Sequence, residues 1–398
     1  MKTNLKRKGL FILHEGINTT IFNSQVLEHV SKMNEHDFDF EILSFNTEPE
    51  LWSTSIENKE KLLNTNPRIN IHLIKSINIF YPFAFIFHMF QLINFLKKSK
   101  VDYSFIHSRS DYTQFIVLIS KYFHKLNSTW DCRGDSISEI KYALEKKNIL
   151  YKIYGFLYII PFFKFLIYIN LIKSKSIIFV SELLKKNLFK IFAPFCKFYI
   201  IPCLVNEKLF FFDSDLRVSM RKKYKIENNQ SVFVYSGSMV GYQSFDLHYE
   251  FYKNILTDNN NILFILTNHI QIAKSYFNNF DNDRVIIKSV DFLKVNDYYN
   301  LADFGILIRN NNLLNRVASP TKFGEYCLTG LKVVMNKNVK QCYNNALNFK
   351  NFVDVKSDIF TNFNLDHRTS IVKESKLLYC REKYVNKYIS MYNNLTAN

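Results

Sequence analysis

The stretch SPTKFGEYCLTG (residues 319–330) decides the fold, because it has the pattern of a short helix between two buried strands. An apolar segment, DFGILIR (303–309), precedes it, and a second apolar segment, LKVVMN (331–336), follows it. Each segment is short, rich in β-branched or aromatic residues and bounded by turn-forming residues, which is typical of a buried strand. The order strand, helix, strand indicates an α/β sheet.

The start of this helix is suited to a phosphate. We expect Ser319 to cap it, Pro320 to take its first helical position, and Gly330 to end it in the left-handed conformation. Free backbone N–H groups and a partial positive charge attract an anion to such a start, and Lys322 adds a cation. One turn later, Glu325 can accept hydrogen bonds from two adjacent ribose hydroxyls. These residues predict a nucleoside diphosphate site, and the alternative is a solvated Lys–Glu pair on an ordinary helix.

The rest of the chain repeats the alternation of strands and helices in two series. Strand patterns of the first half lie at residues 9–13, 38–45, 68–75, 103–109, 128–134, 176–182 and 197–203. Those of the second half lie at 231–237, 261–268, 284–290, 303–309, 331–336 and 351–355. A charged, irregular segment (204–230) separates the series, and residues 377–395 read as a closing helix. The fold class is therefore α/β, with two doubly wound, Rossmann-like domains in tandem and ligands at the carboxyl ends of their strands.

The composition favours an anionic partner. The 398 residues carry a formal net charge of +17, and the sequence pI is about 9.3. Such a balance suits nucleic acid, anionic lipid or a phosphorylated substrate. The basic residues are dispersed instead of forming one stripe, which argues against nucleic acid. Six scattered cysteines without metal-ligand spacing argue against a zinc site or a disulfide framework, and they indicate a reducing cytoplasm.

Two long apolar segments point to a membrane surface. Residues 76–96 carry no formal charge and reach the length of a span, but Pro82 and several polar side chains interrupt them. We expect a helix that is covered by protein or lies at a membrane surface. Residues 149–172 contain only Lys152 and Lys164 as charged side chains. They predict either an interfacial helix that meets anionic headgroups or a helix buried against the sheet.

Several stretches resemble the family 4 retaining glycosyltransferases, particularly the bacterial enzymes that build surface polysaccharides. VFVYSGSMVGYQS, FILTN, VIIKSVDFLKVNDYYNLADFGILIR and VASPTKFGEYCLTGLKVV occur in the family's order within residues 231–336. A weaker resemblance extends through EGINTTIFNSQVLEHV, FIHSRSDYT, WDCRGD and IIFVSELLKKNL. The resemblance implies the GT-B fold, with an acceptor-binding domain (1–205) and a nucleotide-sugar-binding domain (206–375). It also implies that a final helix (376–398) packs back towards the N-terminal domain and that the domains face each other across a cleft.

The resemblance also assigns roles on the donor side. The glutamate at the place of Glu325 would bind the donor ribose, in agreement with the inference from the helix itself. The glycine loop at Gly237 and Ser238 would approach the diphosphate, with Arg309, Lys322 and the helix start at Ser319 as its further contacts. Lys322 is a candidate catalytic residue, since it would stabilise the charge that gathers on the leaving diphosphate.

This chemistry needs no metal, and we expect no metal cofactor. The two Asp-x-Asp sequences, at 213–215 and 281–283, lie in loop-like contexts.

The chain departs from the family pattern at Val317. Many members carry two glutamates separated by seven residues, and the first of them would fall at this position. The usual basic residues after the glycine loop are also not evident in GYQS (241–244). The usual contact to the donor sugar is then missing, or Arg316, Ser319 or backbone amides supply it.

On the acceptor side, polar residues follow three strands of the first series. Glu15 and Gly16 end the first strand, and we expect them to bind the acceptor together with Arg109 and Arg133. His107 is a candidate catalytic residue that would orient the transferred sugar or the acceptor hydroxyl. The alternatives are a structural histidine and a turn that is held by its own Asp–Arg pair.

We therefore expect a retaining glycosyltransferase that moves a sugar from a nucleotide-sugar donor to a saccharide or polyprenyl-linked acceptor in capsule or O-antigen synthesis. It would lie in the cytoplasm, peripherally bound to the anionic inner face of the cell membrane, and would not bind nucleic acid. Two alternatives are a non-catalytic membrane-associated scaffold of transferase ancestry and a basic nucleic-acid-binding protein.

Overall fold

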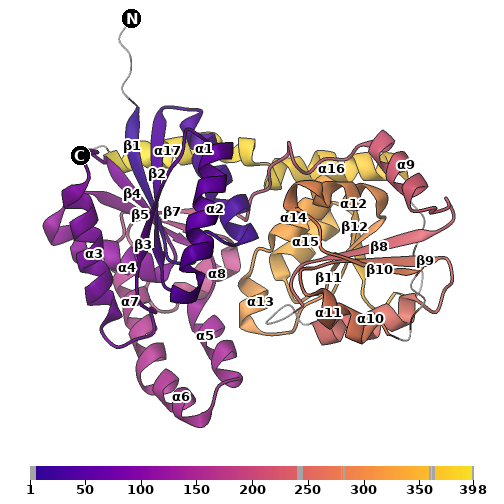
Figure 1. Ribbon diagram of the computed structural model, residues 1–398, viewed down its shortest axis with the longest axis horizontal. Coiled ribbons are helices and arrows are strands. Elements are labelled where there is room, and N and C mark those ends of the chain that lie inside the picture. The colour runs from indigo at the N-terminus through magenta and orange to yellow at the C-terminus, as the bar shows by residue number, and fades with distance from the viewer. Residues whose placement is uncertain are drawn as a thin grey trace, which may run out of the picture. The chain divides into compact units, whose positions relative to one another are not determined.

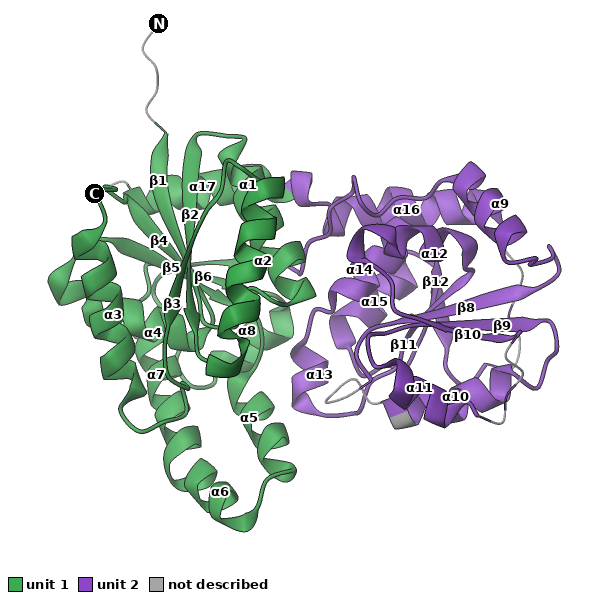
Figure 2. Ribbon diagram, in the orientation of Figure 1, with its two compact units in different colours: residues 1–201, 384–398 green, residues 202–383 purple. Residues whose placement is uncertain are grey.

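The chain folds into two compact α/β units, each built on one parallel sheet (Figures 1 and 2). Unit 1 comprises Met1–Ile201 and Tyr384–Asn398, and unit 2 comprises Pro202–Lys383. The computed structural model describes residues 6–239, 245–278, 280, 283–357, 360 and 364–396. Two doubly wound sheets confirm the α/β class predicted from the alternation of strands and helices.

The sheet of unit 1 has seven strands in the order β3-β2-β1-β4-β5-β6-β7, and each neighbouring pair is parallel. The strands are β1 (Arg7–Leu13), β2 (Phe38–Asn46), β3 (Asn70–Lys75), β4 (Phe105–Arg109), β5 (Asn127–Cys132), β6 (Ser176–Phe179) and β7 (Lys197–Ile200). The strand order reverses between β1 and β4, so this pair is the topological switch point, where ligands of such sheets bind.

The helices of unit 1 connect these strands, apart from the last one, which belongs to the C-terminus. They are the π-helix Phe22–Leu27, α1 (Glu28–Asn34), α2 (Trp52–Thr65), α3 (Ala84–Lys98), α4 (Asp111–Ser120), α5 (Ser136–Glu145), α6 (Ile149–Tyr154), the π-helix Gly155–Ile159, α7 (Ile160–Lys173), α8 (Glu182–Leu188) and α17 (Val385–Thr396). All five residues of β4 are buried, as a strand covered on both faces requires.

Tyr392 of helix α17 reaches the core of unit 1. The ring of Tyr392 stacks on Phe105 at 4.8 Å, and its hydroxyl lies 2.7 Å from Nε2 of His29 and 2.8 Å from Nδ1 of His107. Because Tyr392 is fully buried, these hydrogen bonds replace those that its hydroxyl would make with water.

Unit 2 has six parallel strands in the order β10-β9-β8-β11-β12-β13. The strands are β8 (Ser231–Ser236), β9 (Asn261–Leu266), β10 (Val285–Lys288), β11 (Phe304–Leu307), β12 (Lys332–Met335) and β13 (Phe352–Asp354). The helices are α9 (Ser214–Lys223), α10 (Phe245–Ile255), α11 (Ile270–Tyr276), α12 (Val295–Leu301), α13 (Leu313–Val317), α14 (Thr321–Leu328), α15 (Lys340–Asn348) and α16 (Leu365–Tyr379). The strand order reverses between β8 and β11.

Arginines inside unit 2 bind the ends of two helices. Arg368 is 2% exposed and donates to the carbonyl oxygens of Tyr299, Ala302 and Thr329 at 2.7–2.9 Å. These carbonyls end α12 and α14, where the helix itself provides no donors. Asp303 Oδ1 forms an ion pair with Arg217 Nη2 at 2.5 Å, and its negative charge also acts on Arg368.

Helix α14 begins differently from the expectation. Pro320 is the N-cap residue in extended conformation and not the first helical residue, and no side chain caps the helix. The hydroxyl of Ser319 instead accepts a hydrogen bond from the backbone N–H of Cys203, at 3.1 Å. The predicted cap was wrong because this contact joins residues far apart in sequence. Gly330 does follow the helix in the left-handed conformation, with φ of 72°.

The closing helix expected at 377–395 is interrupted. Helix α16 ends at Tyr379, a 3-10 turn (Arg381–Tyr384) follows, and α17 begins at Val385. Cys380 is extended because its neighbours bond to Val205: Val205 N–H donates to Tyr379 O at 2.9 Å, and Arg381 N–H donates to Val205 O at 3.3 Å.

We predict that Gly330→Ala destabilises the protein by about 2–5 kcal/mol, because the left-handed backbone and the lack of space both oppose a side chain. A Cβ at this position would lie 2.3 Å from Cγ of Arg368 and 2.7 Å from its carbonyl oxygen. Gly16→Ala is the matched control: its φ is 74°, but a Cβ there meets nothing within 4 Å, so the loss should be about 1 kcal/mol. Urea unfolding followed by circular dichroism measures both, and equal losses would contradict the packing argument.

We predict that Tyr392→Phe lowers the free energy of unfolding by about 1–3 kcal/mol, because it removes the hydroxyl that serves His29 and His107 inside the core. Tyr122→Phe is the control, since the Tyr122 side chain is 95% exposed and its hydroxyl faces water. Both tryptophans, Trp52 and Trp130, lie in unit 1, so their fluorescence during urea unfolding reports the loss directly. A Tyr392→Phe protein as stable as the control would show that the hydroxyl of Tyr392 does not contribute to stability.

Candidate functional site

The carboxylate of Glu325 lies in the interior of unit 2. Its side chain is 3% exposed, and its Oε2 accepts hydrogen bonds from the Tyr299 hydroxyl at 3.1 Å and from Lys322 Nζ at 2.9 Å. Oε1 has no hydrogen-bond partner among the residues that the structure describes. Oε1 is not one of the fully buried atoms that lack a partner, so it stays accessible and can accept a hydrogen bond from a hydroxyl of a ligand.

Tyrosines connect this carboxylate to the end of β8. The hydroxyl of Tyr326, the next residue of α14, accepts a hydrogen bond from the N–H of Ser236 at 3.2 Å. Ser236 is the last residue of β8, and Gly237 and Ser238 follow it. Glu325 therefore belongs to the carboxyl edge of the sheet beside the switch point, as expected for a ligand site in this class of fold.

His269 is a member of this edge that the sequence analysis missed. Its Nε2 lies 3.2 Å from Oγ of Ser238, so the loop after β9 contacts the loop after β8. No local motif indicates this histidine, because its role depends on the pairing of the two strands. The GYQS segment of the glycine loop (241–244) lies outside the described residues.

Arg309 follows β11 on the other side of the switch point. It is 5% exposed, and its carbonyl oxygen accepts hydrogen bonds from the side-chain amides of Asn336 and Asn338, both at 2.7 Å. Burial lowers the pKa of the nearby His248 to about 3, and the Arg309 charge acts in the same direction. The structure thus places Arg309 at the edge where a diphosphate contact was predicted.

Lys322 and Glu325 form a shielded pair, with side-chain exposures of 24% and 3%. The alternative of a solvated pair on an ordinary helix does not fit these values. Val317 is also buried, at 2% exposure, so the side chain at this position brings no charge to the site. Ser319 is 8% exposed and engaged by Cys203, as described above.

In unit 1, charged residues gather at the carboxyl ends of β1, β4 and β5. Arg109 Nε donates to Glu15 Oε2 at 3.1 Å, and Arg133 Nε donates to Asp131 Oδ2 at 2.8 Å. Arg109 Nη1 lies 3.9 Å from Asp131 Oδ2, which joins the two pairs. Gly16 borders open space. The four predicted acceptor-binding residues therefore lie at one edge. The Asp131–Arg133 pair, which the alternative of a self-stabilised turn requires, is also present.

Both carboxylates of these pairs are held in the ionised form. Burial acts to raise the pKa of Asp131, but Arg133, then His107 and Arg109 outweigh it and keep the pKa well below its ordinary value. Partial burial likewise acts to raise the pKa of Glu15, and the charges of Arg109 and His14 lower it overall. Two permanent negative charges therefore stand beside two arginines at this edge.

His107 lies deeper than these residues, with 1% exposure. Its ring stacks on Phe11 at 4.4 Å, Nε2 lies 3.2 Å from Asp131 Oδ2, and Nδ1 faces the Tyr392 hydroxyl. Burial lowers the pKa of His107, against the influence of Asp131. These contacts support a role in positioning Asp131, and direct contact between His107 and a substrate stays a prediction.

Two further carboxyl groups at this edge, Asp111 and Glu139, were not found from the sequence. Burial raises the pKa of Asp111 to about 6, although Ser136 Oγ donates to it at 2.6 Å. Glu139 is exposed, but desolvation by the protein on one side of its carboxyl group, followed by the charges of Asp111 and Glu15, raises its pKa to about 7. A group that titrates near neutral pH is suited to proton transfer. Only the fold shows that Glu139, on α5, lies near the ends of β1 and β4.

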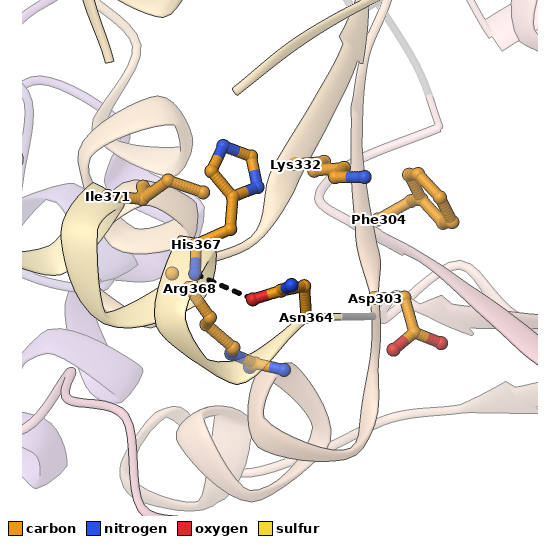
Figure 3. Close-up of a pocket in the computed structure, with 8 residues that line it drawn as sticks. Asp303, Phe304, Lys332, Asn364, His367, Arg368 and Ile371 are labelled. Carbon is orange, nitrogen blue, oxygen red and sulfur yellow. Dashed lines mark hydrogen bonds between the residues drawn. The ribbon is translucent and has the colours of Figure 1, made fainter. Parts of the chain in front are cut away.

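A small pocket at the opposite edge of unit 2 does not belong to this site (Figure 3). Asp303, Phe304 and Lys332 line it, and they lie at the amino ends of β11 and β12. His367 and Arg368 project from α16 on its other side, where His367 N–H donates to Asn364 Oδ1 at 3.0 Å. Ligands of doubly wound sheets bind at the carboxyl edge, so the pocket carries no functional assignment.

In the described part of the chain, no group of three His, Cys, Asp or Glu side chains is placed to hold a metal ion. Asp213 caps α9, since its Oδ1 accepts from the N–H groups of Asp215 and Leu216 at 2.9 and 3.0 Å. Asp281 and Asn282 lie outside the described residues.

No protein-family model matches the sequence, and no curated protein matches it. The fold does match solved structures. Sucrose-phosphate synthase from Thermosynechococcus elongatus is 12% identical with a TM-score of 0.68, over 98% of this chain and 100% of that one. Anabaena HepE in complex with UDP-glucose is 8% identical with a TM-score of 0.63, over 97% of this chain and 99% of that one. WaaG, a glycosyltransferase involved in lipopolysaccharide biosynthesis, is 12% identical with a TM-score of 0.60, over 98% of this chain and 94% of that one. The chain therefore has the GT-B fold of nucleotide-sugar glycosyltransferases, which confirms the fold class implied by the resemblance.

Proposed function

We propose that the protein is a retaining glycosyltransferase that transfers a sugar from a nucleotide-sugar donor to a saccharide acceptor. The observation that carries this proposal is the Glu325 carboxylate at the carboxyl edge of unit 2: the described residues hydrogen-bond its Oε2 twice and leave Oε1 accessible and without a donor. The GT-B fold supports the proposal, because HepE, which shares it, has been solved with UDP-glucose bound.

On the donor side, Glu325 Oε1 would accept hydrogen bonds from the ribose, and the diphosphate would lie against cationic groups. Lys322 is held by Glu325 within one turn of the start of α14, and Arg309 follows β11 on the same edge. The glycine loop at Gly237 and Ser238 would lie close to the diphosphate, although the N–H of Gly237 itself donates to Leu266 O at 3.0 Å. These preorganised donors would stabilise the negative charge of the leaving diphosphate as the glycosidic bond breaks.

On the acceptor side, carboxylates of unit 1 would accept hydrogen bonds from sugar hydroxyls. Glu15 is fixed by Arg109, and Asp131 is fixed by Arg133 and His107. Glu139 is the residue whose protonation changes near neutral pH. In its ionised form it would orient the attacking hydroxyl and help to take up its proton together with the leaving diphosphate.

The finer assignment follows the family resemblance. We propose membership of glycosyltransferase family 4, a lipid-linked saccharide as acceptor, and a place in the synthesis of a cell-surface polysaccharide. Such an enzyme would work in the cytoplasm at the inner face of the membrane and would need no metal. Val317 supports a second candidate, a nucleotide-binding protein without transferase activity, because the contact that many members make to the donor sugar has no carboxylate here.

We predict that UDP or GDP raises the thermal midpoint of the wild type, because a ligand that binds only the folded state stabilises it. Glu325→Gln should lower the affinity for the nucleoside diphosphate by about tenfold or more, since it weakens the hydrogen bonds from the ribose. Lys322→Met should lower the affinity for UDP and leave that for uridine unchanged, because uridine has no phosphate.

The exposed pair formed by Lys253 and Glu250 provides matched controls, since it has the same spacing along a helix. Lys253→Met and Glu250→Gln should bind nucleotides like the wild type. Equal protection by UDP in the wild type and in both site variants would remove Glu325 and Lys322 from the donor site. Binding without any release of UDP from UDP-sugars in the presence of saccharide acceptors would favour the non-catalytic candidate.

We predict that Glu139→Gln removes an ionisation near pH 7 from the pH profile of kcat/KM. In the wild type, the rate should fall below about pH 7 as the raised pKa lets Glu139 take up a proton, because the protonated group no longer accepts the hydroxyl proton. The variant should be slow at all pH values, without this acidic limb. Glu145→Gln, an exposed change at the end of the same helix, should keep the limb. A limb that persists in Glu139→Gln would assign it to another group.

A further inference from the structure

Unit 1 exposes large apolar side chains on two neighbouring segments. The first segment is the start of α3 with the loop before it, and the second comprises α6 and the π-helix after it. Their exposed members are Tyr81 (60%), Phe83 (66%), Ile86 (40%), Phe87 (45%), Phe90 (56%), Ile149 (69%), Leu150 (75%), Ile153 (49%), Phe156 (57%) and Leu157 (77%). We call this set the α3/α6 surface. Scattered exposed apolar residues are ordinary, but so many on two adjoining segments indicate a contact surface.

Hydrogen bonds and ring contacts join the two segments into one surface. The Tyr154 hydroxyl donates to Phe80 O at 2.5 Å, and the Tyr158 hydroxyl accepts from the N–H of Phe83 at 3.1 Å. Phe85 stacks on Phe162 at 5.4 Å. The exposed side chains are therefore presented together by packed elements of a single unit. Figure 1 shows α5 and α6 projecting from the sheet of this unit.

The chemistry of these segments fits an anionic bilayer. Residues 146–173 contain five lysines (Lys146, Lys147, Lys152, Lys164 and Lys173) and no aspartate or glutamate, and residues 76–98 contain two lysines and no carboxylate. Aromatic and aliphatic side chains flanked by lysines suit the boundary between acyl chains and headgroups, and lysine charges are attracted to anionic lipids. A second copy of the chain would bring the same positive charges into contact, which opposes association through this surface.

The packing of α7 indicates that the helix lies on a membrane and does not cross it. Ile149–Lys173 is the one helical stretch of the described chain that is long and apolar enough to span a bilayer. However, Phe163, Leu166, Ile167 and Leu171 are buried, and Asn170 Nδ2 donates to Asp111 O at 2.7 Å. If α7 crossed a bilayer, these contacts with the rest of unit 1 would have to break. Binding at the membrane surface needs only the side chains that are already exposed.

We propose that the α3/α6 surface docks unit 1 on an anionic lipid bilayer, with its apolar side chains in the interface and its lysines at the headgroups. The proposal extends the proposed function, on which its biological meaning rests, since a lipid-linked acceptor is reached at such a surface. The docking itself needs neither donor nor acceptor, so it can be tested separately.

The test is sedimentation of the full chain with vesicles of phosphatidylcholine alone or with 30% phosphatidylglycerol, a composition of about one anionic lipid in three. The wild type should bind the anionic vesicles about tenfold more tightly than the neutral ones, and less tightly at high salt. Leu150→Ser with Leu157→Ser should weaken binding to anionic vesicles about tenfold. Lys146→Glu with Lys147→Glu and Lys152→Glu should remove the preference for anionic lipid.

Val218→Ser with Leu293→Ser is the matched control. Both residues lie in unit 2 and are 67% exposed, so the same loss of apolar surface occurs away from the α3/α6 surface. The control should bind like the wild type, and unchanged circular dichroism should show that all variants fold. The proposal is overturned if Leu150→Ser with Leu157→Ser binds anionic vesicles as tightly as the control does, or if the wild type binds neither kind of vesicle. It is also overturned if the wild type does not bind vesicles but forms a dimer, seen by light scattering, that the Leu150→Ser, Leu157→Ser variant does not form.

Glu325→Gln separates this proposal from the proposed function. It should bind anionic vesicles like the wild type, because it lies in unit 2 and leaves the α3/α6 surface unchanged. Vesicle binding without transferase activity would leave the docking proposal standing, and activity without vesicle binding would overturn docking alone.

Discussion

The burial of the Glu325 carboxylate is the constraint on which the donor side depends. A carboxylate whose side chain is 3% exposed loses most of its hydration, so the fold has to provide donors or a ligand has to bring them. Tyr299 and Lys322 supply two hydrogen bonds, both to Oε2. Within the described residues Oε1 receives no hydrogen bond and stays accessible, which suits a binding site better than a structural ion pair.

The position of α14 determines where this carboxylate points. At one end of the helix, Gly330 lets the chain turn into β12 while the Arg368 side chain packs against it and bonds the last carbonyls. On the neighbouring face, Tyr326 bonds the last residue of β8. These contacts come from three different segments of unit 2, so the site geometry is a property of the whole unit and not of the local motif.

Unit 1 uses a different arrangement of charge. Asp131 is fully buried and contacts Arg133, His107 and Arg109, so its negative charge is compensated and its pKa stays low. Tyr392 extends this network to α17, because its hydroxyl bonds His107. The C-terminal helix thereby influences the edge at which Glu15 and Arg109 meet. Under the proposed function, the acidic groups of this edge would favour neutral hydroxyl groups over a phosphate, whereas Lys322 and Arg309 of unit 2 would favour an anion.

Local sequence patterns were sufficient for most of the fold and for part of the site. Every strand pattern corresponds to an observed strand, because short apolar runs and turn residues are local signals. Glu325, Lys322 and Gly330 were found for the same reason. The predicted cap by Ser319 failed because Cys203, 116 positions away, uses its hydroxyl. His269, Glu139 and Arg368 were missed since their roles arise from contacts between strands and helices distant in sequence.

Under the proposed function, the absence of a carboxylate at position 317 affects the charge at the donor edge. A leaving diphosphate would gain negative charge during transfer, and Lys322 and Arg309 would stabilise that charge best if no other carboxylate competed for them. Glu325 already occupies Lys322 at 2.9 Å, so a second glutamate at position 317 would further reduce the positive charge available to the diphosphate. Val317 removes a contact to the donor sugar in the family pattern, but it also leaves this edge more cationic. The departure from the pattern is therefore compatible with catalysis in which stabilisation of the leaving group carries more of the rate than contacts to the sugar.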